Sequence, residues 1–183
     1  MQIGVPKEIK PLEGRVGLVP SACAELVAAG HQVIVEANAG VLSGYSDADY
    51  EAVGVRLVGS AAEVYAESVL IVKVKEPIDA DLALLRSHHI LFSYLHLAAS
   101  PVLVEALCKI GLMAIAFETV QDNQGLLPLL APMSDIAGRL SIQIGAYLLH
   151  QPQGGKGLLL GGLPGAERGR VTVIGAGVAA VSS

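Results

Sequence analysis

The strongest constraint on the fold is an alternation of short apolar runs with longer segments rich in alanine and leucine. The runs are four to six residues long, the pattern of strands that are covered on both faces. They lie at residues 2–5, 32–36, 69–74, 90–95, 113–118 and 171–175. The intervening segments predict helices at residues 21–29, 60–67, 79–86, 101–110 and 133–150. Strand–helix–strand alternation implies right-handed crossovers, so we predict an α/β fold with a doubly wound, mostly parallel sheet.

Residues that start and end helices support this pattern. Ser60 and Glu63 have the spacing of a capping box, and Ser100 precedes a proline at the first position of a predicted helix. Gly30 and Gly111 follow the ends of two predicted helices, where a residue in the left-handed conformation is expected.

Composition excludes several classes of protein. Of the 183 residues, 52% are apolar and 16% are charged, which rules out a disordered chain. The net charge of −5 does not favour nucleic acid or an anionic membrane as a partner. No apolar stretch approaches the ~20 residues of a membrane span, and the start lacks the pattern of a signal peptide. Cys23 and Cys108 are interpreted as buried thiols of a reducing compartment, so we expect a cytoplasmic protein, without a metal site.

A glycine-rich turn stands near the carboxyl end. The run 171–175 leads into Gly175, Gly177 and Ala180, the G-x-G-x-x-A form of the dinucleotide-binding fingerprint. The alternative is a glycine turn that opens an ordinary strand–helix unit. The chain ends at Ser183, before the acidic residue that would bind the ribose about 20 positions further on. We therefore expect only the first strand and glycine turn of a truncated nucleotide-binding domain.

Three residues of the first half suggest a catalytic site. Arg15 lies between a polar turn and a proline, and Lys75 and His96 each lie at the carboxyl end of a predicted strand, where doubly wound sheets bind ligands. An arginine can clamp a carboxylate, a lysine can hold a second oxygen, and a histidine can transfer a proton near neutral pH. The trio suits a small carboxylate whose adjacent carbon is oxidised or reduced. Lys73 could replace Lys75 in this role, and each of the three could instead be an ordinary structural or solvated residue.

Other polar residues carry less information. Glu118 ends a predicted strand, and Glu76 could pair with a lysine. Ser134 and Asp135 fall in the first turn of the long helix, whose N–H groups could bind an anion, although an ordinary helix cap is the simpler interpretation. The other histidines are interpreted as structural: His31, His88, His89 and His150. Small residues that indicate close helix packing follow in the long helix: Ala137, Gly138, Gly145 and Ala146.

Seven segments, in this order, resemble the amino-terminal half of NAD-dependent alanine dehydrogenases. They are GVPKEIKPLEGRVGLVP, VKVKEP, LFSYLHLA, AFETV, LPLLAPMSDIAGRLSIQIGAYLL, GGKGLLLGG and VTVIGAG. The related nicotinamide nucleotide transhydrogenases share the first segment and the fingerprint. They lack a histidine in the segment matching LFSYLHLA, so His96 favours the dehydrogenase.

The resemblance implies reversible, NAD-dependent oxidative deamination of L-alanine to pyruvate and ammonium. Arg15 and Lys75 would hold the substrate's carboxylate and keto oxygen, and His96 would be the acid/base group. A Rossmann- or flavodoxin-like substrate domain would cover residues 1–130. Residues 131–183 would supply a connecting helix, a glycine-rich linker and the start of an incomplete NAD-binding domain.

The resemblance also implies a cofactor site and an assembly. Ser134 would contact the NAD phosphates, and Gly175 and Gly177, with Ala180 behind them, would lie under the pyrophosphate. Homo-oligomers, usually hexamers built around the long helix, are typical of the family. Because most of the nucleotide domain lies outside these 183 residues, we expect the chain alone to lack dehydrogenase activity. The alternatives are a catalytically silent module that binds small carboxylates or other subunits, and a transhydrogenase-like nucleotide-binding subunit.

Overall fold

The chain forms two compact units, Met1–Thr119 and Val120–Ser183, in a computed structural model that describes residues 1–182. The first unit contains a six-stranded sheet, and the second is built around one long helix. The division at Thr119 lies before residue 130, the predicted end of the first domain.

The sheet of the first unit has the order β3-β2-β1-β4-β5-β6, and every neighbouring pair of strands is parallel. Its strands are β1 Gln2–Val5, β2 Gln32–Glu36, β3 Arg56–Val58, β4 Leu70–Val72, β5 Ile90–Ser93 and β6 Met113–Ala116. Strands β1 to β3 follow one another toward one edge of the sheet. Strand β4 then lies on the other side of β1, and β5 and β6 continue toward the opposite edge. This confirms the predicted doubly wound α/β fold.

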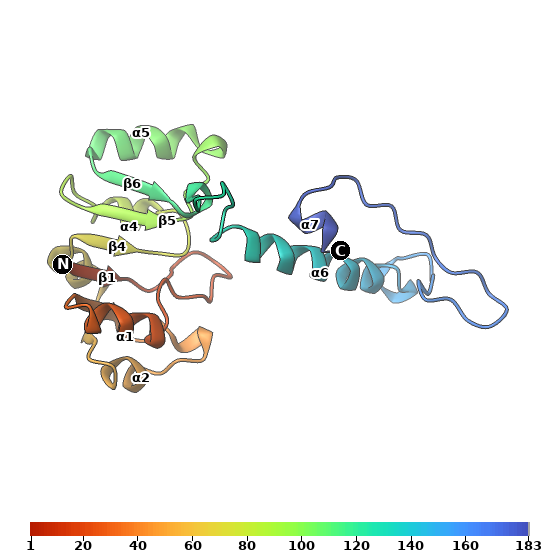
Figure 1. The fold of residues 1–183 in the computed structure, drawn as a ribbon, viewed down its shortest axis with the longest axis horizontal. Coiled ribbons are helices and arrows are strands. Elements are labelled where there is room, and N and C mark those ends of the chain that lie inside the picture. The colour runs from red at the N-terminus through yellow and green to blue at the C-terminus, as the bar shows by residue number, and fades with distance from the viewer. Residues whose placement is uncertain (183) are drawn as a thin grey trace. The chain divides into compact units, whose positions relative to one another are not determined.

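Helices cover both faces of the sheet (Figure 1). They are α1 Pro20–Ala28, α2 Asp47–Glu51, α3 Ala61–Glu67, α4 Asp79–Leu82 and α5 Pro101–Ile110. The alternation along β2 shows how the faces divide, because Val33 and Val35 join one buried cluster with Cys23 of α1, whereas Ile34 joins another with Val64 of α3. The central strands β1, β2 and β4 are mostly apolar because both of their faces are buried, whereas β6 at the edge of the sheet is largely exposed.

Local sequence signals predict most elements of this unit, with several differences. Strand β3 and helix α2 were not predicted, because three and five residues are too few to display a period. Ser60 accepts a hydrogen bond from the Glu63 amide, but the Glu63 carboxylate accepts from the Gly59 amide, so the capping box is only half formed.

Cys23 is buried, whereas Cys108 is exposed, which corrects the interpretation of both thiols as buried. Cys108 follows Leu107, whose side chain turns toward the core from α5.

The second unit contains α6 Ala131–Leu148, the short turns η4 Gln151–Gln153 and α7 Val178–Val181, and long connections without regular structure. The predicted strand at 171–175 does not form. A strand requires a hydrogen-bonded neighbour, and no strand of the described part of this unit is available to pair with it. Gly138 allows α6 and α7 to approach closely, because a Cβ atom there would collide with the Ala179 carbonyl. None of the described helices combines the length and apolar character that a membrane crossing requires.

Candidate active site

Three loops meet at the carboxyl edge of the sheet, near the topological switch point between β1 and β4, where the order of the strands reverses. Arg15 lies in the loop after β1, Lys75 follows β4, and His96 follows β5. Because β1, β4 and β5 are adjacent and parallel, the topology brings these loops to one edge. Crevices at this point of doubly wound sheets are the usual binding sites for ligands.

The loop after β1 runs directly against the end of β4. Gly17 makes this approach possible, since a Cβ atom there would lie 2.7 Å from the Val72 carbonyl oxygen. Glu8, in the same loop, is buried and accepts hydrogen bonds from the amides of Val74 at 2.6 Å and Lys75 at 3.4 Å. The carboxylate of one loop therefore fixes the backbone that carries Lys75.

Arg15 is held by a carboxylate two residues away. The Glu13 Oε1 atom accepts from the Arg15 backbone N–H at 2.9 Å and from its Nε at 2.8 Å, and Oε2 accepts from Nη2 at 2.7 Å. The Arg15 guanidinium holds the pKa of Glu13 below its ordinary value, and the charge of Lys75 adds to this effect. The same pairing raises the pKa of Arg15, so both groups are ionised at neutral pH. Glu13 binds the guanidinium through two parallel N–H···O hydrogen bonds, the same geometry that a substrate carboxylate would use.

The two lysines after β4 differ sharply in their surroundings. The side chain of Lys73 is 1% exposed, and its Nζ lies 3.2 Å from Asp81 Oδ1 and 3.5 Å from Glu8 Oε2. Lys75 is half-buried, and its Nζ has no ion-pair partner within 4.0 Å among residues 1–182. Lys73 therefore belongs to the core, which leaves Lys75 as the lysine that can meet a ligand. Glu76 is ion-paired with Lys10.

His96 adopts an unusual backbone conformation at the end of β5. Its φ and ψ angles are 49° and 39°, in the left-handed region, where histidine is enriched but still strained. The Glu118 carboxylate accepts from the backbone N–H of His96 at 2.7 Å and from that of Leu95 at 3.1 Å. The His96 ring is exposed and stacks on Tyr94, with ring centroids 6.2 Å apart and planes 13° apart.

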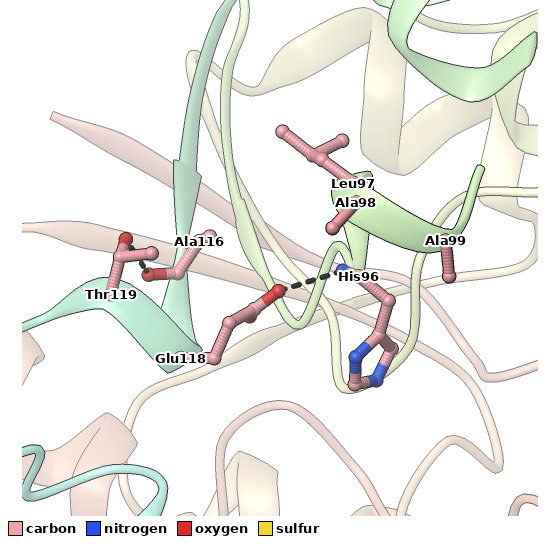
Figure 2. Close-up of a pocket in the computed structure, with 7 residues that line it drawn as sticks. All are labelled: His96, Leu97, Ala98, Ala99, Ala116, Glu118 and Thr119. Carbon is pink, nitrogen blue, oxygen red and sulfur yellow. Dashed lines mark hydrogen bonds between the residues drawn. The ribbon is translucent and has the colours of Figure 1, made fainter. Parts of the chain in front are cut away.

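A cavity of about 360 Å³ lies beside His96 (Figure 2). Seven residues line it: His96, Leu97, Ala98, Ala99, Ala116, Glu118 and Thr119. Neither of the two candidate cations, Arg15 and Lys75, is among these lining residues. The expectation that all three polar groups face a single cavity stays a prediction.

Charged groups on these loops nevertheless influence the pKa values of groups on the neighbouring loops. The pKa of Tyr94 is raised by burial and lowered in part by the Arg15 charge, so Arg15 acts on the residue that stacks against His96. Lys75 acts in turn on Glu13, the partner of Arg15. Three of these residues were not identified from the sequence: Tyr94, Glu8 and Glu13. Glu8 and Tyr94 interact with loops that are distant in the chain, and the hydrogen bonds between Glu13 and Arg15 cannot be inferred from their spacing.

The buried histidine of this unit is structural. His89 Nδ1 accepts from the Arg86 amide at 2.9 Å, and Nε2 lies 2.9 Å from the Tyr65 carbonyl oxygen, so Nε2 carries the proton. Burial lowers the pKa of His89. A neutral, fully bonded ring contributes to packing, as expected for a histidine outside the site.

In the second unit, Ser134 lies on α6 and lines a cavity of about 410 Å³ together with Val178, the first residue of α7. The first-turn amides of α6 are not free for an anion, which was the less favoured of the two interpretations of this helix start. Those of Met133 and Ser134 donate to the Leu130 carbonyl, and that of Ala131 donates to an upstream carbonyl. Ser134 also does not cap the helix, since Leu130 is the capping residue.

The glycine turn of the second unit has part of the geometry of a dinucleotide fingerprint. Gly175 has φ +125°, a conformation reserved for glycine, and the space where a Cβ atom of Gly177 would lie is open. Ala180 lies against the turn, with its Cβ atom 4.0 Å from the position of a Gly175 Cβ. The turn is thus compact and leaves its outer side accessible, as a phosphate group requires.

Two family descriptions match the chain: "Alanine dehydrogenase/PNT, N-terminal domain" over residues 4–137, and "Alanine dehydrogenase/PNT, C-terminal domain" over residues 141–183. Alanine dehydrogenase from Mycobacterium tuberculosis (strain ATCC 25618 / H37Rv) is 52% identical over 179 residues, which cover 98% of this chain and 48% of that protein. The Bacillus subtilis (strain 168) alanine dehydrogenase is 48% identical, with 97% and 47% covered.

Solved structures give the same result. An L-alanine dehydrogenase matches with a TM-score of 0.91 at 50% identity, over 100% of this chain and 50% of that one. A transhydrogenase from Sinorhizobium meliloti matches with a TM-score of 0.71 at 26% identity, over 80% of this chain and 42% of that one. The chain spans about half the length of the relatives it matches. Because the first family description alone covers residues 4–137 of the 183, the chain belongs to the alanine dehydrogenase/PNT family.

Proposed function

We propose that this chain carries the substrate-binding part of an NAD-dependent alanine dehydrogenase, which converts L-alanine, water and NAD⁺ reversibly to pyruvate, ammonium, NADH and a proton. The observation that carries the proposal is the arrangement of Arg15, Lys75 and His96 on adjacent loops at the topological switch point of the sheet. Relatives about 50% identical bear the name alanine dehydrogenase, which supports this choice over the transhydrogenase at 26% identity.

Each side chain has a distinct role in this proposal. The planar guanidinium of Arg15 binds the substrate's carboxylate through two parallel hydrogen bonds. The Lys75 ammonium stabilises the keto oxygen of pyruvate, where negative charge develops. His96 moves a proton at the substrate nitrogen or oxygen, because an imidazole exchanges protons near neutral pH.

The cofactor residues lie in the second unit. Ser134 would contact the NAD phosphates, and the turn of Gly175, Gly177 and Ala180 would lie under the pyrophosphate. The φ angle of Gly175 and the open space at Gly177 fit a phosphate group. The chemistry that NAD supplies when bound is acceptance of a hydride. The acidic residue expected about 20 positions beyond the fingerprint lies outside these 183 residues, so the fit concerns the phosphates alone.

The proposal is tested by titrating the 183-residue chain with pyruvate and with propionate, which has the same carboxylate but no keto oxygen. Calorimetry should show tighter binding of pyruvate. Arg15→Lys should weaken both ligands about tenfold, since a lysine keeps the charge but loses the fork. Lys75→Met should weaken pyruvate alone and remove the preference.

Lys109→Met is the matched control, because Lys109 is exposed at the end of α5, away from the three loops. It should leave both affinities within about twofold. Equal affinity for the two ligands in the unsubstituted chain, or an unchanged affinity in Arg15→Lys, would contradict the assigned roles.

A further inference from the structure

The backbone that carries His96 is held by one carboxylate from the neighbouring strand. Ser93 of β5 pairs with Ala116 of β6, so the residues that follow these strands emerge side by side. Glu118 lies in the turn η3 Phe117–Thr119, and the Thr119 hydroxyl donates to the Ala116 carbonyl at 3.0 Å, which closes this turn. The register of the sheet thus places the Glu118 carboxylate beside the loop that follows β5.

The Glu118 carboxylate bonds two successive amides. Its Oε1 accepts from Leu95 at 3.1 Å and from His96 at 2.7 Å, and its Oε2 lies 3.3 Å from the Leu95 nitrogen. Successive N–H groups converge in this way when one residue adopts the left-handed conformation, and the concavity they form binds an anion. His96 has that conformation. The carboxylate therefore stabilises a backbone turn that a histidine would otherwise leave.

The turn decides where the imidazole lies. Figure 2 shows the hydrogen bond from the His96 backbone nitrogen to Glu118, with the ring extending away from that carboxylate and from Leu97. If the backbone relaxed to an extended conformation, the side chain would leave the loop in another direction, because strand residues alternate between faces. Glu118 contacts the histidine only through its main chain in these bonds, so its effect on the ring is indirect.

We infer that Glu118 is a positioning residue, whose carboxylate fixes the left-handed backbone at His96 and thereby orients the imidazole toward the substrate. The inference rests on the proposed function for the role of His96. It goes further by assigning the orientation of that ring to a residue on a different strand.

The test combines pyruvate titration with ¹H–¹⁵N spectra of the 183-residue chain. Glu118→Ala should shift the amide signals of Leu95 and His96 and weaken pyruvate about tenfold, as much as His96→Ala does. The double variant should bind no more weakly than either single variant, because both changes remove one interaction. Glu118→Gln, which keeps one acceptor oxygen, should recover part of the affinity. Glu105→Gln, at an exposed glutamate of α5, should change neither amide signals nor affinity.

Two results would overturn the inference while leaving the proposed function intact. One is an additive double variant, and the other is a Glu118→Gln chain with unchanged signals and affinity alongside an unsubstituted chain that binds pyruvate. Absence of pyruvate binding by the unsubstituted chain would instead overturn the proposed function, and with it the assignment to Glu118. The conservative Glu118→Gln variant keeps the test decisive if Glu118→Ala does not fold.

Discussion

Lys73 and Lys75 differ by two positions, and the structure predicts opposite consequences for replacing them by methionine. Lys73 contacts two buried carboxylates, Asp81 at 3.2 Å and Glu8 at 3.5 Å. At an effective dielectric constant of about 20, each contact corresponds to about 5 kcal/mol of attraction, most of which the burial of the three charges offsets. Removing the cation leaves both carboxylates buried without a counter-charge. Lys73→Met should therefore lower the free energy of unfolding by about 3–5 kcal/mol.

The pH dependence of this loss has a definite sign. Burial raises the pKa of Glu8, and the attraction of Lys73 only partly opposes this. A carboxyl whose pKa is higher in the folded state binds protons more tightly there, so protonation favours folding as the pH falls. Without Lys73 this effect is larger, so the loss in Lys73→Met should shrink as the pH is lowered from neutral. Adding Glu8→Gln and Asp81→Asn should recover most of the stability, because this cluster then holds no buried charge.

Urea unfolding followed by tyrosine fluorescence measures these differences in the first unit, which contains four of the five tyrosines. Lys75→Met should stay within about 0.5 kcal/mol of the unsubstituted chain while removing the preference for pyruvate over propionate. If Lys73→Met unfolds at the same urea concentration as the unsubstituted chain, or if Lys75→Met is the costlier change, the division of roles between the two lysines is wrong.

Three further predictions concern other parts of the chain. Glu13→Gln should tighten pyruvate binding about three- to tenfold by calorimetry, because it removes the charged partner that competes for the Arg15 guanidinium; weaker binding would contradict this. Gly138→Ala should destabilise the second unit by about 1–3 kcal/mol in thermal unfolding, since the added methyl group meets the backbone of α7. Native chain treated with a thiol reagent should react at Cys108 alone, because Cys23 is buried and its burial raises its pKa to about 11; labelling of both thiols at equal rates would refute it.

Much of the fold follows from local sequence, because its signals act within a few residues. The runs at 2–5 and 32–36 become β1 and β2 with the predicted bounds, and Gly30 and Gly111 take the left-handed conformation where expected. The run at 171–175 has the same apolar character but forms no strand. Its apolar, β-branched composition favours a strand, but a strand forms only where a neighbouring strand can pair with it.

The candidate site was predictable to the extent that position along a strand determines position in the sheet. Lys75 and His96 follow predicted strands, and parallel strands bring their carboxyl ends to one edge. The roles of the residues that support them were not predictable, although Glu118 was noted at the end of a predicted strand. Glu8 and Glu118 bond to backbone amides of other loops, and the register that brings them there is set by the whole sheet.

A site for an anion requires local positive charge, which a chain of net charge −5 must provide beside many carboxylates. Glu8 and Glu118 accept hydrogen bonds from backbone amides of the loops that carry Lys75 and His96. In these bonds they contact neither the Lys75 ammonium nor the His96 ring. Glu13 is different, because it bonds the Arg15 guanidinium itself. If Arg15 binds the substrate carboxylate as proposed, that carboxylate must displace Glu13 or share the guanidinium with it, and it does not compete with Glu8 or Glu118. The same residue type thus serves two purposes in the proposed site: Glu8 and Glu118 hold the loops, and Glu13 bonds the guanidinium that a ligand would have to take over or share.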